Sequence, residues 1–206
     1  PPPPPPCFCQ AQDGIRARSP SRGLGDVYKR QVQARVLGGG AEVEVEMGLV
    51  SFNSSAIPVK GEEREVIRET LEVDGRSLEF CATTVGNPHC VVLSPERSES
   101  AKKLGPLIEN HSLFINRTTV QFLEVIDRKT IRIEIWERGA GYTLASGSSS
   151  SAAAAVARKL GLCDEQIEVQ MPGGSLMIRI DDDGSVLMRG PVTPVGSMKA
   201  DPGIFE

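Results

Sequence analysis

A tight turn, Gly86-Asn87-Pro88-His89, places one of the chain's two histidines at the start of an apolar run. Glycine, asparagine and proline favour tight turns, so we expect His89 to occupy a defined position where a strand begins. A histidine with an ordinary pKa, about 6.5, can take up or release a proton near neutral pH. The simpler alternative is a structural histidine whose ring nitrogens form hydrogen bonds within the turn.

A second group, Glu137-Arg138-Gly139, follows a run of alternating apolar residues that ends at Trp136. An arginine at the end of a strand can bind a carboxylate through two parallel hydrogen bonds. The alternative is that the two charged side chains pair with each other or are solvated.

A glycine- and serine-rich loop, residues 146–151 (SGSSSS), runs into an alanine-rich segment. The first backbone N–H groups of a helix are unpaired and carry the positive end of its dipole, which suits a carboxylate or phosphate. The loop lacks the lysine of a nucleotide-binding P-loop. The alternative is that the serines cap the helix, but a cap needs only one serine and the loop has five. With the two groups above, the loop predicts a site for a small substrate that carries a carboxylate.

The elements that must position these residues are mostly strands. Alternating apolar and acidic residues at 41–47 predict a strand with one solvent-facing side, ended by Gly48. Further strands are expected at residues 64–73, 76–82, 89–93, 119–126, 130–137, 166–171, 175–181 and 185–188. Helices are expected at residues 96–111, where Gly105-Pro106 is a potential break, and at residues 151–160. Because the strands lie in hairpins, the fold class is predicted to be α+β rather than a doubly wound parallel sheet.

Composition excludes several function classes. A net charge of −4 and an aromatic content of 4% argue against a nucleic-acid partner, and no apolar run reaches the roughly 18 residues of a membrane helix. Five cysteines without a secretory signal indicate free thiols and a cytoplasmic location. Residues 1–31, which include a proline homopolymer, lack periodicity and are predicted to be a non-native or disordered leader.

Several of these motifs together resemble the diaminopimelate epimerase family. The resemblance is carried by TTVGNPHCVVL (83–93), LGPLIENHSLF (104–114), ERGAGYTLASGSSSS (137–151), MPGGSLMIRI (171–180) and RGPV (189–192). It implies two similar halves, each a mixed, mostly antiparallel curved sheet around a central helix. Residues 32–56 would be the last part of the N-terminal half, residues 57–191 the C-terminal domain, and residues 192–206 a strand returning to the N-terminal half.

The resemblance also implies the reaction. Members invert the Cα of an amino acid without pyridoxal phosphate, metal or other cofactor, using two cysteines on opposite faces of the substrate. By position, His89 would assist the cysteine of the other half, and Glu137 would assist the acid–base group of this half. Ser146 stands where the family has its second catalytic cysteine.

The substrate-binding roles follow from the same match. Asn87 would touch the substrate, and Arg138 would bind its distal carboxylate. Gly147 and Ser148 would offer backbone N–H groups to the reacting carboxylate, and Thr119 stands where the family selects the distal end. The expected partner is therefore a small amino acid, with no nucleic acid or membrane, and a homodimer is allowed.

Departures from the family pattern keep three functions open. A serine hydroxyl is a far weaker base than a thiolate, Tyr142 replaces an expected Glu, and Thr119 replaces an Asn. Cys81, Cys90 and Cys163 match neither catalytic cysteine and are predicted to be small core residues. The leading interpretation is diaminopimelate epimerase in lysine biosynthesis. The alternatives are a racemase or dehydratase of the same fold with another substrate, and a non-catalytic carboxylate-binding homologue.

Overall fold

Strands predominate in the structure, a computed structural model that describes residues 33–193 and residue 196. The strands are β1 (Ala34–Leu37), β2 (Glu42–Leu49), β3 (Glu69–Val73), β4 (Arg76–Thr84), β5 (Pro88–Val92), β6 (Thr119–Asp127), β7 (Thr130–Glu137), β8 (Gly141–Thr143), β9 (Gln166–Met171), β10 (Gly174–Ile180) and β11 (Ser185–Pro191). The helices are α1 (Ser98–Glu109), α2 (Gly147–Lys159) and a short 3-10 helix, η2 (Gly38–Gly40).

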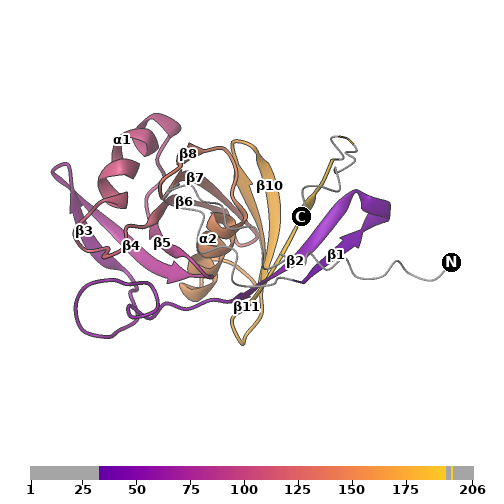
Figure 1. Ribbon diagram of the computed structural model, residues 1–206, viewed down its shortest axis with the longest axis horizontal. Coiled ribbons are helices and arrows are strands. Elements are labelled where there is room, and N and C mark those ends of the chain that lie inside the picture. Colours follow the sequence, from indigo (N-terminus) through magenta and orange to yellow (C-terminus); the bar gives the residue numbers. More distant parts are fainter. Residues whose placement is uncertain (1–32, 194–195, 197–206) are drawn as a thin grey trace, which may run out of the picture.

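All these strands join in one sheet of order β1-β2-β11-β10-β9-β7-β6-β5-β4-β3, with β8 beside β7. The β5–β6 and β7–β9 pairs are parallel and the other pairs are antiparallel. The predicted mixed, mostly antiparallel sheet therefore exists, and it packs around α2 (Figure 1). The α+β label overstates the helices, because the described residues form mostly strands.

The central helix, α2, is buried from Ser149 to Ala157. Alanine side chains are small enough for strands to pack against the helix on several sides, which explains its composition. It begins one turn earlier than predicted because Ser146 caps it, with Oγ accepting a hydrogen bond of 3.4 Å from the Ser149 N–H. It ends at Lys159, close to the predicted end, and Gly161 follows with φ +69°.

Helix α1 covers the opposite face of the sheet. Alternate residues of β4 reach the two cores: Phe80 and Ala82 pack in the core beneath α1, whereas Cys81 packs in the core around α2. Gly105 and Pro106 do not break α1. A Cβ at Gly105 would lie 2.4 Å from Cγ of Trp136, so glycine is needed for the close approach of α1 to β7.

The predicted hairpin turns at residues 74–75 and 127–129 are present, and β9 spans the predicted residues. Strand β2 continues through Gly48, where the strand had been predicted to end, because β11 pairs with it as far as Leu49. Cys81, Cys90 and Cys163 are buried and free, as expected, while Cys7 and Cys9 lie outside the described residues. None of the helices in residues 33–193 is long and apolar enough to cross a membrane.

The N-terminal hairpin, β1–β2, extends away from the rest of the sheet (Figure 1). It is attached along β11, and the Val192 N–H donates to the Ala41 carbonyl at 3.0 Å. Residues 192–206 were predicted to return to residues 32–56, and this hydrogen bond is a contact between the parts of the two segments that the structure describes. The leader, residues 1–31, and most of residues 194–206 lie outside the described residues, and the division into domains stays a prediction.

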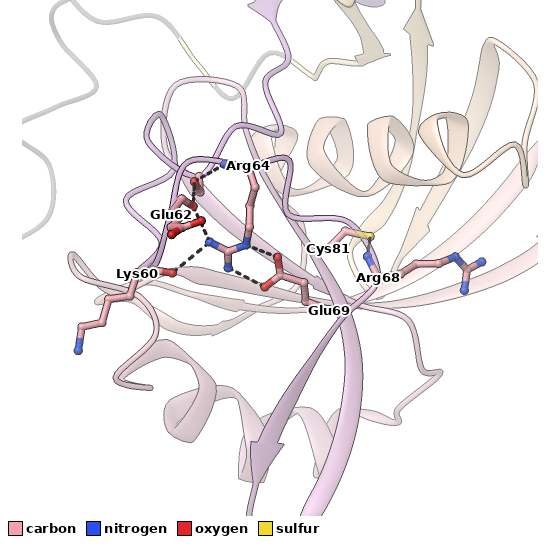
Figure 2. Close-up of polar contacts among 7 residues, drawn as sticks. Lys60, Glu62, Arg64, Arg68, Glu69 and Cys81 are labelled. Atoms are coloured by element: carbon pink, nitrogen blue, oxygen red, sulfur yellow. Dashed lines mark hydrogen bonds and ion pairs between the residues drawn. The ribbon is translucent and has the colours of Figure 1, made fainter.

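A polar cluster fixes the loop before β3, where the predicted strand at residues 64–73 proves to begin only at Glu69 (Figure 2). Arg64 donates from Nε and Nη2 to the Glu69 carboxylate at 2.7 and 2.8 Å. Its Nη1 donates to the carbonyls of Lys60 and Glu62 at 3.2 and 3.0 Å. We call Arg64, Glu69 and these two carbonyls the Arg64 cluster. Arg68 adopts φ +51°, which lies outside the β region, and the strand begins at the next residue.

Candidate active site

The first turn of α2 lies where the serine-rich loop was predicted to present N–H groups. Gly147 and Ser148 are its first residues, and both are partly exposed. The following serines have structural partners: Ser150 Oγ donates to the Ser146 carbonyl at 2.8 Å and Ser151 Oγ donates to the Gly147 carbonyl at 2.9 Å. The number of serines is therefore a weaker sign of an anion site than the sequence suggested, and the N–H groups of Gly147 and Ser148 are what could hold one.

Two methionines shape this turn. A Cβ at Gly147 would lie 2.7 Å from Sδ of Met188, so glycine lets the chain pass close to that side chain. Met171 Sδ accepts a hydrogen bond from the Ser146 N–H at 3.5 Å, and it lies 3.2 Å from Ser150 Oγ, whose hydrogen is donated to the closer Ser146 carbonyl. Ser146 is thus held at the helix start by its own cap and by the thioether.

A buried chain of side chains joins His89 to this helix. Gln121 Nε2 lies 3.0 Å from His89 Nδ1 and 3.0 Å from Ser149 Oγ, and all three residues are fully buried. The parallel register pairs His89 with Thr119, which sets Gln121 two residues along the same face of β6. We call His89, Gln121 and Ser149 the His89 cluster. It connects a predicted catalytic residue to the predicted anion-binding turn.

Sequence reasoning missed Gln121. The signal that could have found it is a single amide near the start of β6 with apolar neighbours on both sides, Val120 and Phe122. A buried amide needs partners, so such a residue predicts a polar contact across the core.

Burial lowers the pKa of His89 to about 3, the Gln121 hydrogen bond opposes this shift, and the charge of Arg138 adds to it. His89 is therefore neutral at pH 7 in this arrangement, and the expectation of an ordinary pKa is wrong here. Within residues 33–193, His89 Nε2 and Gln121 Oε1 are buried without a hydrogen-bond partner. Unsatisfied buried polar atoms are rare in folded proteins, and a catalytic role or a bound water is among their explanations; Thr143 Oγ1 is a further example among the described residues.

The Glu137–Gly139 turn is held by a carboxylate that sequence reasoning also missed. Glu109, 5% exposed, accepts at Oε1 from the Gly139 N–H at 2.9 Å and from Arg117 at 2.8 Å. Its Oε2 accepts from Trp136 Nε1 at 2.7 Å. Glu109 lies eight residues after Ala101, on the buried face of α1, and that spacing could have identified it.

Thr119 and Arg138 are in direct contact. The Arg138 N–H donates to Thr119 Oγ1 at 3.2 Å, and Arg138 Nη1 donates to the Asn116 carbonyl at 3.0 Å. Thr119 is 4% exposed, so its hydroxyl positions the arginine. No ion pair joins Glu137 to Arg138 in the part of the chain that the structure describes.

Asn87 lies half-buried in the turn before β5, where Gly86 has φ +129° and donates its N–H to Thr84 Oγ1 at 3.0 Å. Tyr142 lies elsewhere: its hydroxyl donates to Glu134 at 2.5 Å and it packs in the core beneath α1. Desolvation and the Glu134 carboxylate raise the pKa of Tyr142 to about 12. Tyr142 is therefore poorly suited to exchange a proton at the start of α2.

The structure thus connects His89, Gln121 and the first turn of α2 on one side, and Thr119, Arg138 and Glu109 on the other. His89 lies on β5, Gln121 and Thr119 lie on the neighbouring strand β6, Arg138 directly follows β7, and Glu109 is the last residue of α1. Among the described residues, no group of three or more His, Cys, Asp or Glu side chains could hold a metal ion.

Comparisons with known proteins agree on a family. A family model described as diaminopimelate epimerase matches residues 81–195. Diaminopimelate epimerase 2 of Nostoc sp. is 55% identical over 175 residues, which cover 84% of this chain and 61% of that protein. Diaminopimelate epimerase of Stutzerimonas stutzeri is 39% identical, covering 81% and 64%. The chain therefore spans about three fifths of the length of these relatives.

Solved structures support the fold. A hydroxyproline epimerase from Agrobacterium vitis with bound trans-4-hydroxy-L-proline matches with a TM-score of 0.57 at 12% identity, covering 78% of this chain and 53% of that one. A probable proline racemase from Agrobacterium radiobacter with bound carbonate matches with a TM-score of 0.57 at 14% identity, covering 84% and 58%. At this identity the likeness concerns the fold alone.

Proposed function

The chain belongs to the diaminopimelate epimerase family, and from that membership we propose that it supplies the C-terminal half of a diaminopimelate epimerase active site. The reaction would be cofactor-independent inversion of LL-diaminopimelate to the meso form, in cytoplasmic lysine biosynthesis. A homodimer stays a prediction.

One observation carries the proposal: the first turn of α2 is tied through Gln121 to the buried His89. Removing a proton from Cα develops negative charge on the substrate carboxylate. Backbone N–H groups at a fixed helix start stabilise such charge without reorganising. Gly147 and Ser148 would supply them, and a carboxylate bound there would lie near the His89 cluster.

The remaining residues have consistent roles. Arg138, whose main chain is held by Thr119 and whose neighbour Gly139 is held by Glu109, would bind the distal carboxylate. Glu137, at the end of β7, would contact the substrate and assist residue 146. Asn87 would touch the substrate from the turn before β5.

Ser146 favours a second candidate, an amino-acid racemase or dehydratase of the same fold with another substrate. Its hydroxyl already caps α2, and a serine without a strong base beside it is a poor proton acceptor. If Ser146 cannot act as a base, inversion of diaminopimelate would be slow, although proton removal from the other face would remain.

A hybrid protein tests these candidates. It would keep the Nostoc relative's own sequence outside the matched region and carry this chain's sequence within it. Uptake of deuterium at Cα in D₂O and conversion of LL- to meso-diaminopimelate are measured together. We expect exchange to exceed inversion, and Ser146→Cys to raise inversion by about 10²–10⁴-fold, the range of one acid–base group.

Other amino acids serve as controls in the same assay. Exchange of proline or hydroxyproline but not diaminopimelate would overturn the proposal in favour of the second candidate. Binding of diaminopimelate without exchange of any substrate would indicate a non-catalytic carboxylate-binding homologue. Equal inversion by the serine form and Ser146→Cys would contradict the argument from the two thiols.

A further inference from the structure

Glu109, the last residue of α1, is a buried carboxylate with three donors from separate parts of the chain. Its Oε1 accepts from Arg117 Nη1 at 2.8 Å and from the Gly139 N–H at 2.9 Å, and its Oε2 accepts from Trp136 Nε1 at 2.7 Å. Burying a carboxylate is costly unless it is paired and hydrogen-bonded, so these three contacts keep it in one position. Glu109 therefore connects the end of α1 to the end of β7.

The segment that Glu109 holds is the short connection between β7 and β8, residues 138–140. Two successive N–H groups of this connection are bound: that of Arg138 donates to Thr119 Oγ1 at 3.2 Å, and that of Gly139 donates to Glu109. Gly139 has φ +77°, a backbone conformation that glycine adopts at little cost. One side chain from β6 and one from α1 thus fix the main chain from which Arg138 extends.

Two arginines lie near this carboxylate, and they have different partners. Arg117 is paired with Glu109, whereas Arg138 forms no ion pair within the described part of the chain. The one hydrogen bond that described residues accept from the Arg138 guanidinium runs from Nη1 to the Asn116 carbonyl, at 3.0 Å. Its Nε and Nη2 lie on the other edge, and such a pair of N–H groups can bind a carboxylate through two parallel hydrogen bonds.

We propose that Glu109 is a positioning residue for the distal carboxylate of the substrate. It fixes the β7–β8 connection and pairs with Arg117, so that Arg138 presents its Nε–Nη2 edge to that carboxylate. This inference rests on the proposed function and deepens it, because it names the residue that sets the preference for a substrate with a second carboxylate. The positive charge of Arg138 also lowers the pKa of His89, which is consistent with a place for this guanidinium beside the His89 cluster.

Two substitutions of Glu109 change its contacts to different extents. Glu109→Met keeps a similar length and removes every acceptor, so Arg117, Trp136 and Gly139 all lose their partner. Glu109→Gln keeps one accepting oxygen, but its NH₂ group accepts nothing, so at least one donor is left unpaired and the negative charge is lost. We expect the same effects in both variants, smaller in Glu109→Gln.

Nitrogen-15 NMR of this chain measures the positioning without any substrate. The chain has one tryptophan, so its indole N–H gives a single signal. In both Glu109 variants we expect the indole and Gly139 amide protons to move upfield and the Arg138 amide to shift. Glu69→Gln is the matched control: it alters the carboxylate of the Arg64 cluster and should leave these three signals unchanged.

Kinetics of the hybrid protein measure the effect on the substrate. Arg138→Gln and Glu109→Met should each raise KM for diaminopimelate by about 10–100-fold, the range of a hydrogen bond to a charged group. The value of kcat should change by under about threefold, because a distal contact is made equally in the ground state and the transition state. Glu69→Gln should change neither.

The double variant separates positioning from a direct contact. If Glu109 acts through Arg138, adding Glu109→Met to Arg138→Gln should raise KM by under about twofold further. Additive effects on KM, or a loss confined to kcat, would overturn the proposal. If Glu109→Met does not fold, Glu109→Gln decides by the same criteria.

These outcomes separate the inference from the proposed function. Unchanged Arg138 and Gly139 amide signals in the Glu109 variants would overturn the inference even if the hybrid epimerises diaminopimelate. A hybrid that exchanges no Cα proton of diaminopimelate, while these signals shift as expected, would reject the proposed function and leave the positioning of Arg138 by Glu109 standing.

Discussion

The Arg64 cluster and the His89 cluster are both polar, but they are built in opposite ways. In the Arg64 cluster, a charged guanidinium uses all three of its nitrogens on a carboxylate and two carbonyls, and the arginine side chain keeps 33% of its surface exposed. In the His89 cluster, neutral groups are fully buried and two of their atoms have no partner among the described residues.

The difference separates a structural role from a functional one. A cluster in which every nitrogen is bonded has nothing left to offer a ligand, and it holds a loop against a strand. A buried cluster with an unpaired ring nitrogen and an unpaired carbonyl is less stable than it could be, and such a cost is typical of sites that bind or react. Four predictions test this contrast.

The largest expected effect is on activity. In the hybrid protein, His89→Gln should lower Cα–H exchange of diaminopimelate by about 10²–10⁴-fold, because it removes the imidazole that is expected to assist proton removal. Arg64→Gln is the matched control and should leave exchange unchanged, since it alters only the loop before β3. Equal losses in both variants, measured at matched folded concentration, would show that the two clusters do not differ in role.

The second effect is on the pH dependence of stability. Because the folded-state pKa of His89, about 3, lies below its unfolded value of 6.5, the unfolded chain binds a proton first as the pH falls. The contribution of the neutral His89 ring to the free energy of unfolding is fully present above about pH 6.5 and is lost progressively down to about pH 3. Between pH 7 and pH 5 it amounts to ~2 kcal/mol of unfolding free energy.

Urea unfolding at the two pH values measures this contribution. His89→Gln, which does not titrate, should lose less stability than the unaltered chain over the same interval. Arg64→Gln should lose as much as the unaltered chain. If His89→Gln and the unaltered chain lose equal amounts, His89 is not buried as a neutral ring.

A smaller effect is expected when the Arg64 cluster is removed. Arg64→Met leaves the Glu69 carboxylate and two carbonyls without their donor and should cost about 1 kcal/mol of unfolding free energy. Arg68→Met is the control, because the Arg68–Glu79 pair is about half exposed and should contribute under about 0.5 kcal/mol. Thermal unfolding compares the two, and a larger loss for Arg68→Met would contradict this assignment.

The smallest effect is expected at the helix start. Ser148→Ala keeps the backbone N–H, so diaminopimelate binding by the hybrid should change by less than about twofold, and stability by under about 0.5 kcal/mol. Ser150→Ala removes the 2.8 Å bond to the Ser146 carbonyl and should cost about 1 kcal/mol. A large loss of binding in Ser148→Ala, measured by calorimetry, would mean that the hydroxyl and not the backbone holds the carboxylate.

Local sequence was enough for most of the elements, and it also predicted the residues of the candidate site, whose roles stay predictions. The hairpin turns at Asp74-Gly75 and at residues 127–129, the alternation of β7 and β9, and the alanine-rich α2 are all encoded within a few neighbouring residues. The same holds for the motifs around His89, Arg138 and Gly147, because turns and helix starts depend on short-range geometry.

Only the tertiary structure decided what those residues are bonded to. The late start of β3, the intact helix at Gly105-Pro106 and the extension of β2 through Gly48 follow from Arg64, Trp136 and β11, which lie far away in the sequence. The partners of His89, namely Gln121 and Ser149, come from separate elements. Its neutral state depends on complete burial, a property of the packed chain that no local pattern carries.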